Sequence, residues 1–445
     1  MQSYHHLVKS FRINPDMHIT LVSITLSFFL ATISAVVTPT HGFLDFYANV
    51  QKNGQKRMIG SKASIIPLTR RLSPHLKSRS RRNLQTGDAN LTASSLGTNF
   101  LAEVTFGTQT FPLVIDTGSS DTWVPATNVE CVDPDTNNAV NQSVCAFGPL
   151  FQDAAALTPI PGIVMNQTYV SGEFMTGPMY LEQVTLGGLT INQTQVSIVT
   201  SAFWEGDGVN SGILGLSSPN TTAAVSTKNG DQVIYNPILT NMFNKNMTNP
   251  FFSLALDKAT SGPAGYFVIG GLPPVAHDND FTTVPIELKT EEFGTKLPGP
   301  TFTDYLVNVT GFSYNGKTGD TGGVRNLQMI VDSGTTTNVV PAKVAACIND
   351  LFTPPGRYNK TIGGFQVACN VSAPSVGIQI GNNTFPINPA ATIFEAEPGI
   401  CTSGWEAGGD PKDPDTEFFL GDVFLTNVVA VFDLGAMQMH FASRK

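Results

Sequence analysis

Histidine is scarce in this 445-residue chain, and only His277 and His440 lie after residue 89. A serine–histidine–aspartate triad would need one of them, but we expect His277 in a loop and His440 in the last strand, both at the surface. No cluster of His and Cys has the spacing of zinc ligands. The isolated pair Gly270–Gly271 does not resemble a phosphate-binding loop. The sequence therefore predicts no metal and no cofactor.

Charged side chains are also scarce, at 13% of the chain, whereas glycine (41 residues) and proline (29 residues) are abundant. Long helices would need more Ala, Glu, Lys and Leu, so the composition predicts short strands joined by many turns. Apolar residues make up 41% of the chain, which is enough for a large core and for more than one domain.

Lysine and arginine are concentrated in the first 89 residues. This head carries 12 of the 25 Lys and Arg but only three acids, whereas the body carries 13 basic and 31 acidic residues. An acidic body argues against nucleic acid as a partner, because phosphate binding needs clustered cations. It is typical either of a solubility surface or of a protein made for acid.

The head contains an apolar run at residues 19–37, ITLVSITLSFFLATISAVV, preceded by Lys9 and Arg12. The run is typical of a signal peptide, and the small residues Ser34 and Ala35 favour its cleavage. Its 19 residues could instead span a membrane as an uncleaved signal anchor.

The rest of the head, residues 38–89, is basic and poor in patterned apolar residues. It includes the run Arg79-Ser80-Arg81-Arg82, which is typical of a site for a processing protease. We therefore predict that this segment is a removable propeptide.

The five cysteines suit an oxidising compartment. Cys131 and Cys145 close a short polar loop, and Cys369 and Cys401 form the second predicted pair. Cys347 lies in the helix-like stretch PAKVAACINDLF, where we expect a free buried thiol. Other pairings stay open, because connectivity cannot be read from sequence. Sequons for N-glycosylation, which support secretion, include Asn90, Asn166, Asn192, Asn308, Asn359 and Asn382.

The chain repeats one motif 216 residues apart. VIDTGSSDTWVP (residues 114–125) and MIVDSGTTTNVVP (residues 329–341) both run from apolar residues into Asp-Thr/Ser-Gly. GILGLSSP (residues 212–219) follows the first copy, and FFLGDVFL (residues 418–425) follows the second. The repeat predicts two similar lobes, each contributing one aspartate to a cleft between them.

These features divide the chain into four predicted parts. Residues 1–37 are a signal peptide or signal anchor, and residues 38–89 are the basic propeptide. Residues 90–277 form an N-terminal lobe, and residues 278–445 form a C-terminal lobe, with the boundary in a Gly/Pro-rich stretch.

Two neighbouring aspartates have a defined chemistry. Their like charges repel, so the pair retains one shared proton and its two pKa values split. One carboxylate of such a pair can activate a water molecule while the other protonates a carbonyl oxygen. Hydroxyls next to each aspartate can donate hydrogen bonds, and the glycines allow close backbone approach.

Over roughly residues 97–443 the sequence resembles the pepsin (A1) family of aspartic endopeptidases. The resemblance rests on DTGSSDTWVP, GILGL, IVDSGTTT, CTSGW and FLGDVFLTNVVAVFD. It implies a mostly β, bilobal fold with two similar β-barrel-like lobes and the active-site cleft between them. It also implies that Asp116 and Asp332 are the catalytic dyad. The implied supporting residues are Thr117, Gly118, Ser119, Ser333, Gly334 and Thr335.

The resemblance also implies a β-hairpin flap over the substrate, matched by QTYVSGEFMTG at residues 167–177. Tyr169 would be the flap tyrosine and Trp123 its hydrogen-bonding neighbour, although each could also be an ordinary packing residue. Ser171 and Gly172 would lie at the flap tip. The flap departs from the Tyr-Gly-Thr/Asp-Gly of many family members, which leaves fine substrate preference open.

We therefore expect a monomeric aspartic endopeptidase of the secretory pathway, made as a zymogen with its propeptide as an intramolecular inhibitor. Its partners would be extended peptides, cut at acidic pH between apolar residues, and it would be extracellular, vacuolar or lysosomal. A pepsin-like binding protein without catalysis is an alternative from another class. A membrane-anchored processing protease is a third, if residues 19–37 stay uncleaved.

Overall fold

The computed structural model describes residues 99–257, 263–292, 295–318, 326–397, 399–411 and 416–445, together with the backbone of residues 64–70. The apolar run at residues 19–37, the rest of segment 38–89 and the sequon at Asn90 lie outside the described residues. Across the described ranges, no helix is both long and apolar enough to cross a membrane.

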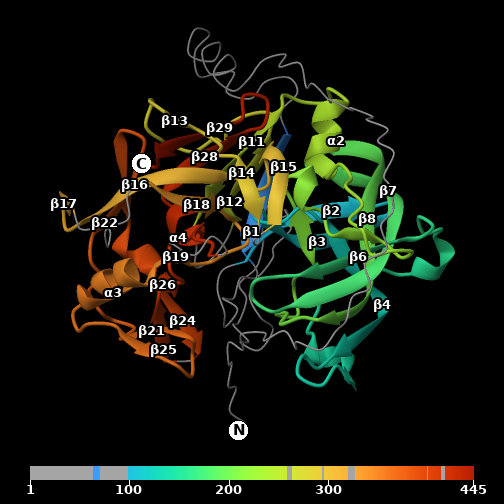
Figure 1. Ribbon diagram of the computed structural model, residues 1–445, viewed down its shortest axis with the longest axis horizontal. Coiled ribbons are helices and arrows are strands. Elements are labelled where there is room, and N and C mark those ends of the chain that lie inside the picture. Colours follow the sequence, from blue (N-terminus) through green and yellow to red (C-terminus); the bar gives the residue numbers. More distant parts are fainter. Residues whose placement is uncertain are drawn as a thin grey trace, which may run out of the picture.

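The molecule has two β-rich lobes side by side, one from each half of the chain (Figure 1). The first lobe is built on the strand order β10-β6-β7-β8-β4-β9-β3-β2, with β5 beside β4. Its elements are β2 (Phe100–Phe106), β3 (Gln109–Asp116), β4 (Trp123–Val132), β5 (Ala139–Val140), β6 (Ile163–Thr168), β7 (Phe174–Leu186), β8 (Leu189–Phe203), β9 (Ile213–Gly215), β10 (Ala224–Ser226) and helix α2 (Ile238–Asn244).

The first hairpin shows how local sequence sets the strands. In β2, FLAEVTF, the fully buried residues line one face, while Glu103 points to solvent. Phe106 pairs with Gln109, so Gly107 and Thr108 form a two-residue turn, and Gly107 has a φ of 57°. The stretch LAEVTFGTQTFPLVIDTG (residues 101–118) predicts two strands joined by a turn at Gly107–Thr110, and the structure confirms this hairpin.

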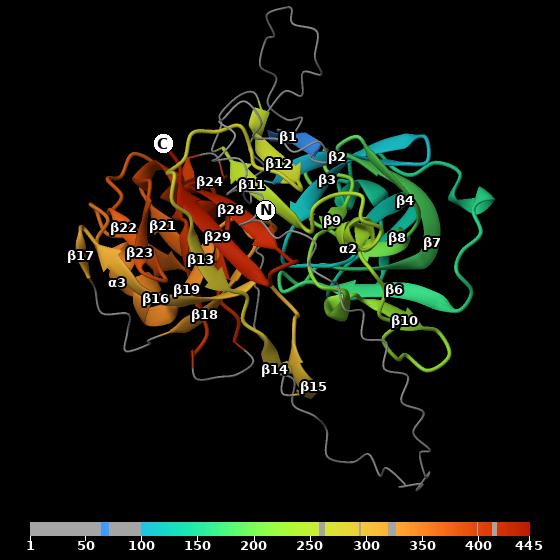
Figure 2. The ribbon, with the colours of Figure 1, turned by 90° about the horizontal axis from the view of Figure 1, so that it is seen from above.

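A central group of strands joins the lobes and continues the same sheet in the order β2-β1-β12-β11-β28-β29-β13 (Figure 2). These strands are β1 (Ser64–Arg70), β11 (Phe251–Leu256), β12 (Pro263–Ile269), β13 (Thr282–Pro285), β28 (Val428–Asp433) and β29 (Gln438–Ser443). β1 comes from the basic segment 38–89, and its backbone pairs with both β2 and β12.

The central strands are apolar because they are covered on both faces. Every residue of β11 (FFSLAL) and of β28 (VVAVFD) is buried, so apart from Ser253 and Asp433 these strands are apolar without alternation. Phe252 stacks on Phe432 with ring centroids 4.5 Å apart, and Tyr305 meets Phe432 edge-on at 4.7 Å. This aromatic contact packs the two halves of the chain on one core.

His440 lies in this covered sheet, so the prediction that it is a surface residue was wrong. It belongs to the last strand, as expected, but β29 is flanked by β28 and β13. The side chain is 0% exposed, and its Nδ1 lies 2.8 Å from the Thr283 hydroxyl. His277 lies between strands and is half-buried.

The second lobe contains an eight-stranded sheet, a four-stranded sheet and the separate hairpin β14–β15. Its elements are β14 (Lys289–Glu292), β15 (Thr295–Thr301), β16 (Leu306–Tyr314), β17 (Lys317–Thr318), β18 (Leu327–Val331), β19 (Asn338–Pro341), α3 (Ala342–Asp350), β20 (Arg357–Asn359), β21 (Gly364–Val367), β22 (Val376–Ile380), β23 (Asn383–Ile387), β24 (Ile393–Glu397), β25 (Ile400–Ser403), β26 (Trp405–Gly408), β27 (Phe419–Leu420) and α4 (Asp422–Leu425).

Helix α3 confirms the helix predicted around Cys347 but contradicts the buried thiol. Val344, Ala345 and Ile348 are buried on the face that packs inward. Because Cys347 follows Ala345 by two positions, it falls on the opposite side of the helix. Cys347 is a free cysteine and is exposed.

Candidate active site

Each aspartate of the repeated motif lies at the end of a strand with a parallel neighbour. In the first lobe, β3 ends at Asp116, which pairs in register with Gly215 of β9. In the second lobe, β18 ends at Val331, and the amide of the next residue, Asp332, donates to the carbonyl of Leu420 in β27 at 3.0 Å. The predicted repeat is thus present as the same strand arrangement in both lobes.

Gly118 and Gly334 bring the backbone of each motif against the opposite carboxylate. The Gly118 amide donates to Asp116 Oδ1 at 2.8 Å, and the Gly334 amide donates to Asp332 Oδ1 at 2.7 Å. A Cβ atom built on Gly118 would lie 2.6 Å from Cγ of Asp332, and one on Gly334 would overlap the carboxylate of Asp116. Only glycine lets the two aspartates approach this closely.

Hydroxyl groups hold the second oxygen of each carboxylate. Ser119 Oγ donates to Asp116 Oδ2, and Thr335 Oγ1 donates to Asp332 Oδ2 at 2.5 Å. Each carboxylate therefore accepts one backbone and one hydroxyl hydrogen bond, in matching positions. Charge-assisted bonds of this kind fix the orientation of a carboxylate.

Thr117 and Ser333 bind the two motifs to each other. Thr117 Oγ1 donates to the carbonyl of Val331 at 2.8 Å and accepts from the Ser333 amide at 2.9 Å. Ser333 Oγ donates to the carbonyl of Ile115 at 2.8 Å. Both side chains are fully or almost fully buried, so this reciprocal brace fixes the separation of the aspartates from inside the core.

Burial raises the pKa of both aspartates, which are 5% and 6% exposed for Asp116 and Asp332. For Asp332 the negative charge of Asp116 raises the pKa further. The hydrogen bonds from Ser119 and Gly118 to Asp116 oppose the effect of burial there. Because two charges in this site repel, the arrangement favours one shared proton.

The hairpin of β6 and β7 brings Tyr169 near Asp116. β6 and β7 pair from Val164↔Pro178 to Thr168↔Phe174, and the turn between them contains Tyr169. The Gly172 amide donates to the Tyr169 carbonyl at 2.9 Å, and Gly172 has a φ of 94°, which favours glycine. Trp123 Nε1 donates to Tyr169 Oη at 3.0 Å. The structure therefore brings the predicted flap tyrosine and its neighbour together.

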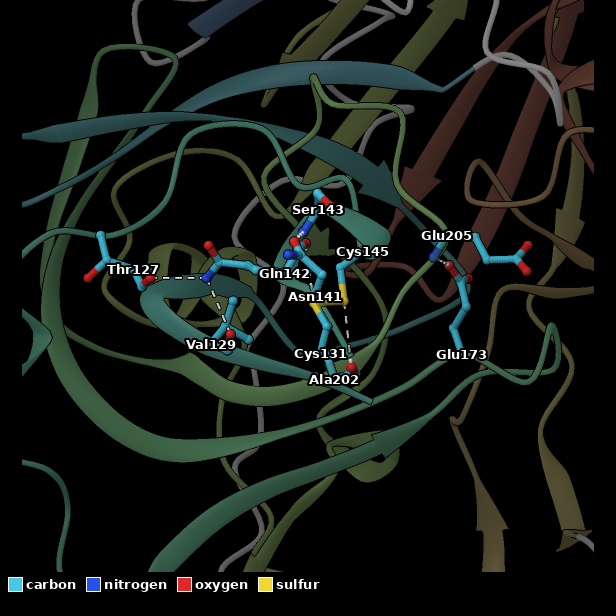
Figure 3. The surroundings of a disulfide bond; sticks show 10 residues. All are labelled: Thr127, Val129, Cys131, Asn141, Gln142, Ser143, Cys145, Glu173, Ala202 and Glu205. Atoms are coloured by element: carbon cyan, nitrogen blue, oxygen red, sulfur yellow. Dashed lines mark hydrogen bonds between the residues drawn. A yellow bond between two sulfur atoms is a disulfide. The ribbon is translucent and has the colours of Figure 1, made fainter. Parts of the chain in front are cut away.

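The tip of this hairpin is anchored at Glu173. Ser171 Oγ donates to Glu173 Oε2 at 2.9 Å. The Glu205 amide donates to Glu173 Oε1 at 2.9 Å (Figure 3). Burial raises the pKa of Glu173, against the effect of these hydrogen bonds. Ser171 and Gly172 are exposed, and Val170 is 82% exposed, so the outer part of the tip faces solvent.

The model of the eukaryotic aspartyl protease family matches residues 99–444. The chain belongs to this family. It is an aspartic-type endopeptidase with the pepsin-like fold.

Known relatives of the protease agree with this assignment. The chain is 38% identical over 374 residues to a probable aspartic-type endopeptidase of Aspergillus fumigatus, covering 81% of this chain and 82% of that one. It is 26% identical to rhizopuspepsin of Rhizopus chinensis, over 77% and 78% of the two chains. The crystal structure of an aspartic proteinase from Irpex lacteus shares the fold with a TM-score of 0.62, at 19% identity over 86% of this chain and 98% of the other.

The protease contains both disulfides of the predicted pairing. Cys131 and Cys145 are joined with a Cα–Cα distance of 6.0 Å, and Cys369 and Cys401 with 5.1 Å. The first closes a loop beside β4, where Gln142 Nε2 donates to the Val129 carbonyl at 3.2 Å (Figure 3). The Gly206 amide donates to the Cys145 carbonyl at 3.0 Å, so the loop also supports the segment that holds Glu173.

Sequence reasoning missed one carboxylate of the protease, Asp121. It is 1% exposed, and Tyr235 Oη and the Ala223 amide donate to its two oxygens at 2.6 and 2.7 Å. Burial raises its pKa to about 6, although both hydrogen bonds act in the opposite direction. The signal was a second acid in the motif, five residues after Asp116 and two before Trp123, but neither hydrogen-bond donor is a sequence neighbour.

Proposed function

We propose that Asp116 and Asp332 are the catalytic dyad of this endopeptidase and hydrolyse peptide bonds by general acid–base catalysis. The observation that carries the proposal is the symmetric site, in which two buried carboxylates face each other across two glycines. Each is oriented by its own amide and hydroxyl donor. A shared proton supplies a base and an acid in the same site.

The reaction needs no covalent intermediate. The ionised carboxylate takes a proton from water as the water oxygen attacks the peptide carbonyl carbon, and the protonated carboxyl gives its proton to the carbonyl oxygen. The resulting tetrahedral diol breaks its C–N bond when the first aspartate returns a proton to the nitrogen. The second aspartate recovers its proton from a diol hydroxyl. The fixed hydrogen bonds on both carboxylates hold this geometry without reorganisation.

Extended peptides are the proposed substrates, with apolar residues on both sides of the cleaved bond. The flap offers exposed backbone at Ser171 and Gly172 for strand-like pairing with a peptide. Beneath it, Trp123, Met165 and Met175 form a buried apolar cluster on which Tyr169 packs. Tyr169 is only partly buried and lies near Asp116, so its ring is the apolar part of this cluster that favours apolar side chains at the cut.

The test is cleavage of denatured haemoglobin from pH 2 to 7 by the wild type, Asp116→Asn and Asp332→Asn, with Asp135→Asn as an exposed control. We expect activity in acid that each dyad substitution reduces by at least about a thousandfold, because one member of a pair that acts as a unit cannot be replaced. Equal activity of Asp332→Asn and the Asp135→Asn control would contradict the dyad.

We also propose that residues 38–89 keep the protease latent until acid releases them. β1 lies within this segment, and its backbone pairs with β2 and β12 of the central sheet. The head is strongly cationic and the body strongly anionic, so they attract at neutral pH. Acid neutralises carboxylates on the body and weakens that attraction.

A variant with Arg70, Arg71, Arg79, Arg81 and Arg82 changed to Gln tests the latency. We expect it to lose latency at neutral pH, and we expect high salt to loosen the wild-type head in the same direction, because salt screens the attraction. Full latency of this variant in a folded protein would rule out the electrostatic account.

The proposed destination is the secretory pathway, with an extracellular, vacuolar or lysosomal end point and a monomeric enzyme. Two disulfides suit an oxidising compartment. The sequons Asn166, Asn192 and Asn382 are exposed, as glycan attachment requires. N-terminal sequencing of the mature protein would decide whether residues 19–37 are removed or remain as an anchor.

A further inference from the structure

Asp121 belongs to the same loop as Asp116 and Trp123 but touches neither the dyad nor the flap directly. Both of its oxygens are occupied by donors from segments far along the chain. Tyr235 Oη donates to Oδ1 at 2.6 Å, and the Ala223 amide donates to Oδ2 at 2.7 Å. A buried acid is costly unless its hydrogen bonds repay the burial, so this position requires an explanation.

Ala223 connects Asp121 to the flap through a single residue. Its amide is held by Asp121, and its carbonyl accepts from the Asn166 amide at 3.0 Å. Asn166 lies in β6, the first strand of the flap, three residues before Tyr169. The next residue, Ala224, begins β10, which pairs with β6 from Ala224↔Met165 to Ser226↔Ile163.

Tyr235 belongs to a segment that pairs with β10, the strand beside the flap strand β6. Val233, two residues earlier, donates its amide to the Ala224 carbonyl at 2.7 Å. The Tyr235 ring is 5% exposed and packs in the cluster that contains Trp123 and Met165, against which Tyr169 lies. The carboxylate of Asp121 therefore binds both Ala223 and Tyr235, the two residues that contact the base of the flap.

We propose that Asp121 is a positioning residue for the flap, acting through Ala223 and Tyr235 to hold β10 and β6 where Tyr169 meets Trp123. This inference rests on the proposed peptidase function of the same site. The segment from Asp116 to Trp123 would then position the flap at two points. One is the direct bond from Trp123 to Tyr169, and the other is the Asp121 link to the base of the hairpin.

The electrostatics of the flap agree with this proximity. Burial raises the pKa of Tyr169, and the charges of Asp116 and Asp121 both raise it further, against the hydrogen bond from Trp123. Burial also raises the pKa of Tyr235, followed by the charge of Asp121. Asp121 thus lies close enough to act on the flap tyrosine as well as on its own partner.

Asp121→Leu is the decisive variant, because leucine has a similar size but accepts no hydrogen bond. We expect hydrogen exchange to accelerate in residues 163–168 and not in β22, because Asp121 no longer holds Ala223, whose carbonyl accepts from the Asn166 amide. We expect KM for a long peptide substrate to rise about tenfold, as for a lost buried hydrogen bond, with kcat changing less. The reason is that a loosened flap must be ordered again when substrate binds.

Two further variants separate positioning from general stability. Asp121→Asn should rescue KM to within about threefold of the wild type, because its Oδ1 can accept from Ala223 while its Nδ2 donates to Tyr235 Oη. Ser253→Ala is the matched control. It removes a buried hydroxyl that donates to the Gly271 carbonyl at 2.7 Å in the central sheet, away from the flap. This control should lower stability without changing KM.

The outcomes are distinct. The inference is wrong if Asp121→Leu folds and its KM and flap exchange match the Ser253→Ala control. If Asp121→Leu does not fold, Tyr235→Phe decides, with a smaller rise in both quantities supporting the link and no rise overturning it. If the activated wild type cleaves no peptide, the proposed function fails, while the exchange measurement still tests the connection from Asp121 to β6.

Discussion

Asp121 should make the folded protein less stable as the pH rises, and replacing it with asparagine should remove that dependence. The side chain is 1% exposed, and burial raises its pKa from the ordinary 3.8 to about 6. The hydrogen bonds from Tyr235 and Ala223 lower the pKa but do not cancel the effect of burial. The folded state therefore binds this proton more tightly than the unfolded chain does.

The sign and size follow from that difference. Below pH 3.8 the group is protonated in both states, so it makes no pH-dependent contribution. Between pH 3.8 and 6 the unfolded chain releases the proton while the folded protein retains it, so the free energy of unfolding falls as the pH rises. The shift of about 2 pKa units corresponds to about 3 kcal/mol, lost in full above pH 6.

The assay is urea unfolding from pH 3 to 8, extrapolated linearly to water. Both proteins should carry Asp332→Asn, so that self-digestion in acid does not interfere. The free energy of unfolding of Asp121→Asn minus that of the parent should rise by about 3 kcal/mol between pH 3 and 8, with most of the change below pH 6. A difference that stays constant over this range would refute the reasoning. A difference that falls would show that hydrogen bonding to the ionised form outweighs burial.

Three further predictions concern the site and its surface. Gly118→Ala should abolish activity, because the added methyl group would lie 2.6 Å from Cγ of Asp332, and calorimetry should show a lower melting temperature. A variant with normal kcat would contradict this close approach of Gly118 to Asp332. Thr117→Val should cost about 1–3 kcal/mol in denaturant unfolding, because it leaves the buried Ser333 amide without its acceptor, and a neutral result would show that the brace carries no stability. Glycopeptide mass spectrometry should find a glycan at the exposed Asn382 and none at Asn308, whose Nδ2 donates to Glu287 at 2.6 Å; an occupied Asn308 would contradict this.

The sequence predicted the features that depend on a repeated motif or on residues close together in the chain. Two Asp-Thr/Ser-Gly motifs with similar downstream partners indicated two lobes and a shared site, and both motifs have the same strand arrangement. The β2–β3 turn and helix α3 followed from neighbouring residues alone. Tyr169 and Trp123 came from the family resemblance, and the structure joins them by a hydrogen bond.

The features that sequence reasoning missed depend on contacts between distant segments. His440 looked like a polar residue in a terminal strand, but its burial depends on β13 covering the sheet edge. Cys347 was expected inside because cysteine is usually buried, yet its place on α3 is set by which face meets the core. Lys289 binds Asp304 at 2.7 Å and Glu417 at 2.8 Å, and nothing in the sequence pairs residues so far apart.

The pH affects both the buried acids and the attraction between the basic head and the body. Burial raises the pKa of Asp116, Asp121 and Asp332, so each group makes the folded body less stable at neutral pH than in acid. On the proposed secretory route the chain folds near neutral pH, where this cost is largest. On our proposal the cationic head offsets it, by attracting the ionised body and by adding β1 to the central sheet. Residues 90–445 expressed alone should therefore refold poorly at pH 7 but stay folded at pH 4. Equal refolding yields at pH 7 with and without the head would contradict this role of the head.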